Sequence, residues 1–174
     1  GAVSGAVIGG GNEAFLLKSA TKSGLTMNEV ALIQKESNLP MDVISQFHSM
    51  KEYLVYKEAG LKPVIVNGRV ALVQDIDLDY VSELSDGTKV TNLERMQRGF
   101  APIEPATGKA YELHHIGQKA DGTLAVLTRD QHRKNASILN QPGKASEIDR
   151  LGFGNTRKDF WEYAGTYVFG NGGV

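Results

Sequence analysis

The sequence predicts an α+β domain with an N-terminal helical extension, a β-hairpin and a ββα unit made of two strands and a helix. Three observations support this fold class. Apolar residues recur at helical spacing between residues 26 and 60, two short apolar strands flank Asn67-Gly68, and a strand–loop–strand–helix pattern runs from residue 110 to residue 134. Helices and strands can be told apart in this way because their side-chain directions repeat with different periods.

The helical extension is predicted to contain two helices. Thr26 and Glu29 form a capping-box pattern, which indicates a helix that ends near Ser37. A second helix is expected to begin at Pro40 and to stop at Gly60, because proline suits a first helical turn and glycine a C-terminal end. Its apolar positions are Val43, Ile44, Phe47, Met50, Leu54 and Val55.

The segment Val64–Val73 is predicted to be a β-hairpin, since Asn67-Gly68 is a favoured two-residue turn. Asp75, Asp77 and Asp79 follow at a spacing of two. The glycine and the distal glutamate of a calcium-binding loop are missing here, so we expect the three acids to form the solvated face of a strand.

The remaining elements surround the ββα unit. We expect, in chain order, a turn at Asp86-Gly87, a short helix at Leu93–Arg98 capped by Asn92 and stopped by Gly99, strands at Ala110–His114 and Leu124–Leu127, a helix capped by Thr128, a break at Gln141-Pro142-Gly143, and a final amphipathic helix at Thr156–Tyr163. In that last helix, Phe160, Trp161 and Tyr163 are expected to belong to the core and not to a base-stacking platform.

Composition limits the possible classes of protein. The chain has 174 residues, 41% of them hydrophobic and 22% charged, which fits one domain with an extension. No apolar run reaches the roughly 18 residues that cross a bilayer. The absence of cysteine excludes disulfides and cysteine-based zinc sites. Net charge is −1, but residues 92–174 carry a net charge of +2, a slight basic excess in the part that holds most of the histidines.

The start of the chain is predicted to be a connecting segment. Residues 1–12 have the composition of a flexible, Gly-rich linker. The sequence does not begin with methionine, and we therefore expect it to be a segment of a longer protein.

Histidine is the residue type that carries the functional prediction. Of four histidines, His114, His115 and His132 fall within nineteen positions, whereas His48 lies far upstream and is expected to be an ordinary surface or half-buried helix residue. Neighbouring side chains of a strand point to opposite faces, so one ring of the pair can face a metal and the other a water, while His132 supplies a ligand from the next helix. This arrangement suits phosphodiester hydrolysis. A structural pair with one ring buried and one exposed is the alternative.

The segment Tyr111–His115 resembles the corresponding part of the colicin-type HNH DNases. A longer pattern, spread over about Lys51 to Tyr163, resembles the LHH family of the HNH/endonuclease VII superfamily. It comprises Thr91-Asn92-Leu93-Glu94-Arg95-Met96, Gly99-Phe100-Ala101-Pro102, Leu113-His114-His115-Ile116-Gly117-Gln118, Leu124-Ala125-Val126-Leu127-Thr128 and His132. The resemblance implies a ββα-metal, treble-clef-like fold. It also implies that residues 51–174 form the nuclease domain of a bacterial polymorphic toxin, with residues 1–50 as its linker and entry region.

The resemblance further implies roles for individual residues. His115 is expected to be the general base, and His114 and His132 ligands of one divalent ion, which is magnesium, manganese or zinc. The other expected site residues are Glu112, an accessory acid that orients a neighbour; Arg95, a catalytic group that grips phosphate; Arg98, Gln118, Arg129 and Arg133, which bind substrate; and Asn135 and Asn140, further metal ligands. The two asparagines stand in for histidines of the related patterns, one of which falls at Ala136 in this chain.

The expected activity is non-specific hydrolysis of DNA in the cytoplasm of a competitor bacterium, after secretion or delivery from the cell surface by a contact-dependent or type VII system. An RNase with the same site, and a catalytically inactive module that binds nucleic acid or protein, are the alternatives. The implied partners are DNA, a cognate immunity protein and the parent carrier chain.

Overall fold

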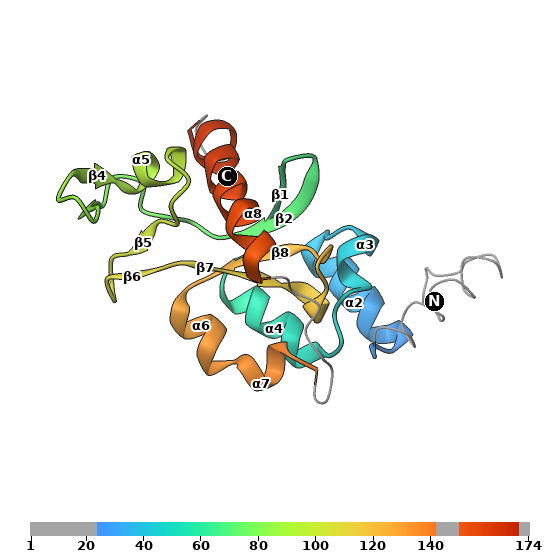
Figure 1. Ribbon diagram of the computed structural model, residues 1–174. Coiled ribbons are helices and arrows are strands. Elements are labelled where there is room, and N and C mark those ends of the chain that lie inside the picture. The colour runs from blue at the N-terminus through green and yellow to red at the C-terminus, as the bar shows by residue number, and fades with distance from the viewer. Residues whose placement is uncertain (1–23, 142–149, 171–174) are drawn as a thin grey trace. The chain divides into compact units, whose positions relative to one another are not determined.

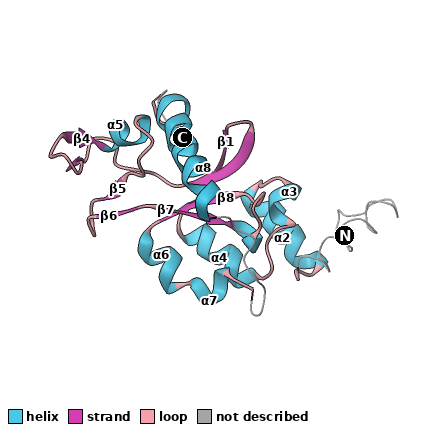
Figure 2. Cartoon of the chain, in the orientation of Figure 1, coloured by secondary structure: helices cyan, strands magenta, loops and turns pink. Residues whose placement is uncertain are grey.

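The computed structural model describes residues 24–141 and 150–170, which Figure 1 shows in colour. The chain divides into two compact units, residues 1–55 and residues 56–174. The mixture of helices and strands confirms the α+β class (Figure 2). The expected linker at residues 1–12 and the break at Pro142-Gly143 lie outside the described residues. Among the residues that are described, no helix is long and apolar enough to span a membrane.

In the first unit, helix α2 (Met27–Ser37) begins as predicted. Thr26 Oγ1 accepts a hydrogen bond from the Glu29 backbone at 3.2 Å, and Glu29 Oε1 accepts one from the Thr26 backbone at 2.8 Å. These reciprocal bonds satisfy two amide groups that a helix start leaves open.

The prediction of a single helix between residues 40 and 60 is wrong. The chain forms α3 (Met41–Ile44), turns, and begins α4 (Met50–Glu58), so His48 lies in the turn and not on a helix. The cause is a polar cap: Ser49 Oγ accepts from the Glu52 backbone at 3.1 Å, and the buried Glu52 carboxylate accepts from the His48 backbone at 2.7 Å. The same carboxylate lies 2.8 Å from Nδ1 of the His48 ring.

The second unit is built on a four-stranded sheet in the order β1-β2-β8-β7. The strands are β1 (Lys62–Val66), β2 (Arg69–Val73), β7 (Glu112–His115) and β8 (Leu124–Leu127). The predicted hairpin is confirmed, with positive φ angles of 51° at Asn67 and 78° at Gly68, as this turn requires. Strand β7 pairs with β8 and, among the described residues, lies at one edge of the sheet.

Between β2 and β7 the structure departs from the sequence prediction in several places. Residues 75–79 form no strand, although their three acids are exposed as expected. An unpredicted hairpin follows, made of β3 (Val81–Glu83) and β4 (Lys89–Thr91) around the predicted Asp86-Gly87 turn. Two further short strands, β5 (Ile103–Glu104) and β6 (Lys109–Ala110), pair with each other, so the expected strand Ala110–His114 divides at Tyr111.

Helix α5 (Asn92–Gln97) is capped by Thr91 and not, as predicted, by Asn92. Thr91 Oγ1 accepts from the Glu94 backbone, and Glu94 Oε1 accepts from the Thr91 backbone. Asn92 is instead buried, where its side chain bonds the backbone of Asp77 and both polar backbone atoms of Ile103. The side chain therefore ties α5 to β5 and to the loop that holds Asp77, and it does not serve as the cap.

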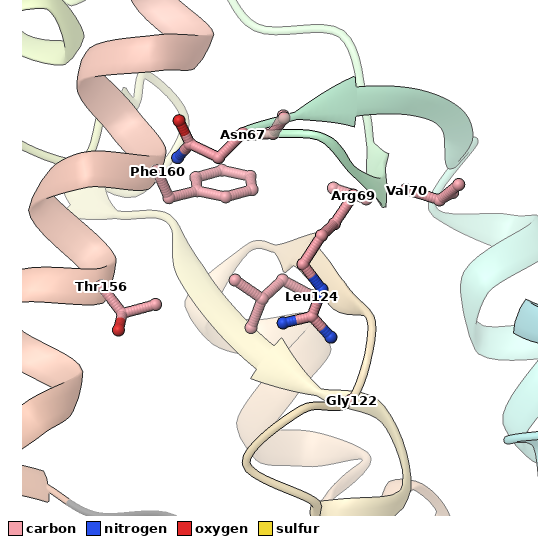
Figure 3. A pocket seen from close by; sticks show the side chains of 9 residues that line it. Asn67, Arg69, Val70, Gly122, Leu124, Thr156 and Phe160 are labelled. Atoms are coloured by element: carbon pink, nitrogen blue, oxygen red, sulfur yellow. The ribbon is translucent and has the colours of Figure 1, made fainter.

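The two faces of the sheet are covered by different helices (Figure 1). After the short 3-10 turn η1 (Ile116–Gln118) and β8, helix α6 (Arg129–Lys134) begins at its predicted Thr128 cap and contacts β7 and β8, and α7 (Ala136–Leu139) follows. The last helix, α8 (Arg150–Tyr163), begins earlier than expected and continues into a π-helical turn, η2 (Ala164–Val168). The core beneath it contains Trp161 and Phe160, as predicted, and Figure 3 shows Phe160 and Thr156 beside Leu124 of β8.

Candidate active site

His114 and His132 lie together on the α6 face of the sheet. Their ring centroids are 5.1 Å apart, with the planes inclined by 60°. His114 is only 4% exposed, and the ring of Tyr56 lies beside it at 6.4 Å between centroids. The strand histidine and the helix histidine, eighteen positions apart in the sequence, are therefore neighbours in the fold.

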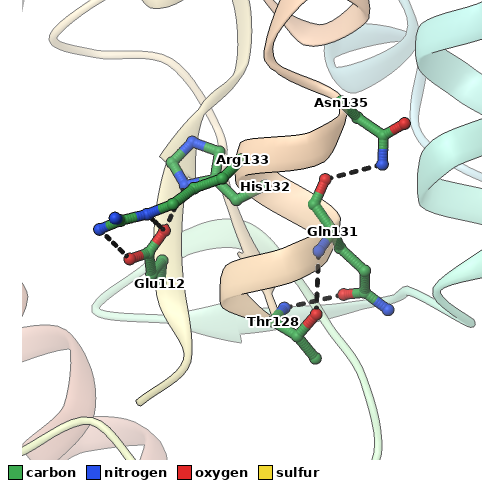
Figure 4. A network of polar contacts seen from close by, with 6 residues as sticks. All are labelled: Glu112, Thr128, Gln131, His132, Arg133 and Asn135. Carbon is green, nitrogen blue, oxygen red and sulfur yellow. Dashed lines mark hydrogen bonds and ion pairs between the residues drawn. The ribbon is translucent and has the colours of Figure 1, made fainter. Parts of the chain in front are cut away.

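Glu112 fixes the position of His132. Its Oε1 lies 2.9 Å from Nδ1 of the His132 ring, and its Oε2 accepts a hydrogen bond of 2.9 Å from Nη2 of Arg133 (Figure 4). Burial alone raises the pKa of the Glu112 carboxyl, but hydrogen bonds from Arg133 and His132 outweigh it and hold this pKa below its ordinary value. An ionised carboxylate at Nδ1 favours the tautomer in which Nε2 is the basic atom of His132.

His115 points to the opposite face of the strand. It is 9% exposed, and its ring contacts that of Phe153 from α8, with 4.7 Å between centroids and the planes inclined by 62°. Burial lowers the pKa of its imidazole, and the positive charge of Arg69 on β2 lowers it further. His115 is therefore neutral at pH 7, the state in which an imidazole can accept a proton.

A groove of about 560 Å³ borders the edge strand β7. It is lined by Ala101, Ala110, Tyr111, Glu112 and Leu113, by Arg129, His132, Arg133 and Ala136, and by Phe153 and Arg157 of α8. The guanidinium of Arg157 lies 5.3 Å from the centre of the Phe153 ring. Among the described residues, three arginines line the groove against a single carboxylate, an excess of positive charge that attracts phosphate.

Comparison with known families adds to this geometry. Residues 91–165 match the family LHH. The family is described as a nuclease of the HNH/ENDO VII superfamily with conserved LHH. The match confirms the resemblance drawn from the sequence, over a shorter segment than expected. No curated protein and no solved structure matches the chain.

The segment that matches LHH also contains residues that the sequence did not single out. Phe153 and Arg157, one helical turn apart on α8, complete the groove. Phe153 precedes Thr156, where the last helix was expected to begin. Arg69, whose positive charge lowers the pKa of His115, lies outside the LHH segment, in the first hairpin. A basic residue directly after the Asn67-Gly68 turn gave no signal of its own, because only the parallel pairing of β2 with β8 brings it near His115.

The arginines and glutamine predicted on the two sides of the LHH motif are placed differently. Arg95 is half-buried, where its Nε donates to the Ala101 backbone at 2.8 Å and its guanidinium lies 5.8 Å from the Phe100 ring centre. Arg98 is exposed at the end of α5. Gln118 accepts a hydrogen bond of 3.0 Å from the Gln141 backbone. None of these three lines the groove, and their roles stay predictions.

The two asparagines lie at the ends of α6 and α7. Asn135 ends α6, its amide donates to the Gln131 backbone at 2.8 Å, and Figure 4 shows it on the other side of the helix from Glu112. Asn140 ends α7. Helical spacing would place Asn135 near His132 only if α6 continued, and it stops at Lys134. Their assignment as ligands stays a prediction without geometric support.

The donor set fits part of a metal shell. HNH nucleases generally use a divalent metal, yet the described residues contain no group of three or more His, Asp or Glu that could hold one. His114 and His132 can supply two imidazole donors, while Glu112 is engaged by His132 and Arg133. Two imidazoles suit a transition ion such as zinc, with its other positions left to water or phosphate.

Proposed function

We propose that this protein is an endonuclease that hydrolyses the phosphodiester bonds of DNA without sequence preference. The observation that carries the proposal is the pair formed by His114 and His132, with His132 in the wall of a groove to which Arg129, Arg133 and Arg157 contribute. Phe153 both lines that groove and contacts His115, so the imidazole lies directly behind the Phe153 ring. The match to the LHH nuclease family supports the same reaction class.

The residues of the site divide the work of hydrolysis among them. Arg129 and Arg157 bind phosphate from the two helices that flank the groove, without reading bases. His115 accepts the proton of the attacking water. Glu112 holds His132 in one tautomer, which leaves Nε2 of His132 available beside His114. A divalent ion bound by these two rings would supply charge stabilisation for the phosphate oxygens and the leaving group.

The biological setting that we propose is that of a toxin domain. The domain would be carried by a longer secreted or surface-delivered chain, act in the cytoplasm of a target bacterium and be neutralised by an immunity protein. This setting is supported by the resemblance of the sequence to toxin domains.

A cleavage assay tests the function. The full chain is incubated with supercoiled plasmid, and in a separate arm with tRNA, in the presence of magnesium, manganese, zinc or a chelator. Plasmid nicking with added ion is expected, with loss in chelator and in His115→Ala. Lys134→Ala is the matched control, because Lys134 is an exposed residue of α6 that pairs with Asp130 and does not line the groove.

Three results would contradict the proposal. Full activity of a folded His115→Ala variant would remove the general base. Cleavage of tRNA alone would replace DNA by RNA as the substrate. No cleavage of either nucleic acid with any of the ions would leave the binding module as the remaining function.

A further inference from the structure

A second, smaller cavity of about 90 Å³ lies against the α8 face of the sheet. Leu124 and Phe160 contribute apolar walls, and Asn67, Arg69 and Thr156 bring an amide, a guanidinium and a hydroxyl to its border (Figure 3). The Arg69 guanidinium is held in place by a hydrogen bond to the backbone carbonyl of Asp121. Asn67 Nδ2 donates to the Asp159 backbone at 3.3 Å and Thr156 Oγ1 to the Gly152 backbone at 3.5 Å, so all three polar groups have fixed directions around an apolar space.

Strand register places this cavity beside His115. Ala71 of β2 pairs with Leu124 of β8, and Leu124 pairs with His115 of β7. Residues directly opposite each other in a sheet share a face, so the three side chains lie in a row on one side. Leu124 and Ala71 line the cavity, and His115 is the next residue of the row.

Helix α8 covers both parts of that row. Phe153 meets the His115 ring, and Thr156 and Phe160 line the cavity one and two turns further along the helix. His115 and the cavity are therefore covered by consecutive turns of one helix.

The chemistry of the cavity matches a nucleobase. A base has apolar faces and an edge of hydrogen-bond donors and acceptors, and proteins bind unpaired bases with aromatic rings and arginines. One buried water needs about 10–15 Å³ of such space, so the cavity holds several waters, or a single planar ring. A phosphate alone would leave its apolar walls unused.

We propose that this cavity is a subsite for the unpaired base next to the scissile phosphate, and that single-stranded nucleic acid is the preferred substrate class. The inference rests on the proposed nuclease function. A base in a duplex is stacked and paired, so it enters such a cavity only after being extracted from the helix at a cost in free energy.

A bulky substitution at the cavity border tests the subsite by cleavage. Thr156→Trp fills the entrance from an exposed helix position, and Asn155→Trp places the same side chain on the neighbouring exposed position, outside the cavity. The unmodified protein is expected to cleave a single strand about tenfold faster than the same sequence in a hairpin duplex. Thr156→Trp should lose this preference and Asn155→Trp should keep it. Equal rates for both substrates, or a preference that survives Thr156→Trp, would overturn the subsite.

A binding measurement separates the subsite from the nuclease function. Fluorescence anisotropy with the His115→Ala protein compares a labelled single strand with a strand of the same length made of abasic units. About tenfold tighter binding of the strand with bases is expected, and Thr156→Trp should reduce that ratio. Retained discrimination without any cleavage by the unmodified protein would refute the nuclease function and keep the subsite. Cleavage by the unmodified protein, with equal binding of the strands with and without bases, would refute the subsite and keep the nuclease function.

Discussion

Oε1 of Glu112 on the edge strand lies 2.9 Å from Nδ1 of His132 on α6. Arg133 approaches the same carboxylate, so one acid binds two groups of the helix. The contact joins the first strand and the helix of the ββα unit at the point where the histidine pair forms. It therefore couples the stability of the unit to the ionisation of a single carboxyl group.

Glu112→Gln should destabilise the fold at neutral pH and leave its stability at acid pH nearly unchanged. The pKa of Glu112 is lower in the folded protein than in the unfolded chain, because Arg133 and His132 outweigh the effect of burial. Its contribution is therefore present above the unfolded pKa and is lost as the pH falls through the folded one. Urea unfolding at pH 7, 5 and 3 measures the difference between variant and unmodified protein.

The matched control is Glu162→Gln, which removes an exposed pair with Lys158 at 3.7 Å. Such pairs contribute little, so its effect should be small at each pH. A Glu112→Gln deficit that stays constant from pH 7 to pH 3 would show that the charge of the carboxylate is not what stabilises the unit.

Arg69→Met should move the acid limb of the pH–activity profile to higher pH. Burial lowers the pKa of His115 first, and the charge of Arg69 lowers it further. Removing that charge raises the pKa in part, and the neutral base then needs a higher pH to form. The measurement is kcat/KM against pH. Arg69→Lys retains the charge and should leave the limb in place, whereas an unshifted limb in Arg69→Met would exclude His115 as the titrating base.

Arg157→Ala should weaken nucleic-acid binding equally for all sequences. If Arg157 contacts one phosphate, the slope of log binding constant against log salt concentration should fall by about one. Anisotropy titrations between low and physiological salt, in the His115→Ala background, measure it. Lys158→Ala removes a neighbouring exposed charge that does not line the groove, and its slope should be unchanged. Equal slopes for the two variants would place Arg157 outside the binding surface.

The elements that sequence reasoning predicted correctly are those with local signals. Thr26-Glu29 and Thr128 define helix starts through contacts within four residues, and Asn67-Gly68 needs only its own backbone conformation. The break before α4 was missed because it depends on the burial of Glu52 against His48, which an apolar helical pattern conceals. Strands β3 and β4 have three residues each, too few for a period to be recognised.

In the candidate site, too, the sequence predicted the contacts within one local unit and missed those made by distant elements. His114 and His132 belong to the first strand and the helix of one ββα unit, so a short stretch of chain brings them together and the pattern indicates the pairing. Arg69 and Phe153 reach His115 from opposite ends of the second unit, through strand pairing and helix packing that no spacing reveals. The role of Asn135 as a ligand stays a prediction, because the expected helical face assumed that α6 continues beyond Lys134.

Gly165→Ala should lower the free energy of unfolding by about 1–3 kcal/mol, because the added methyl group overpacks the contact between η2 and α5. A Cβ at residue 165 would lie 2.7 Å from the Met96 Cβ and 2.8 Å from the Gln97 backbone nitrogen. Gly154→Ala in α8 is the matched control: nothing lies within 4 Å of its Cβ position, and alanine favours a helix, so this variant should be slightly more stable. Urea unfolding measures both, and opposite signs are expected. A Gly165→Ala protein as stable as the Gly154→Ala protein would show that α5 and the π-helical turn are not in close contact.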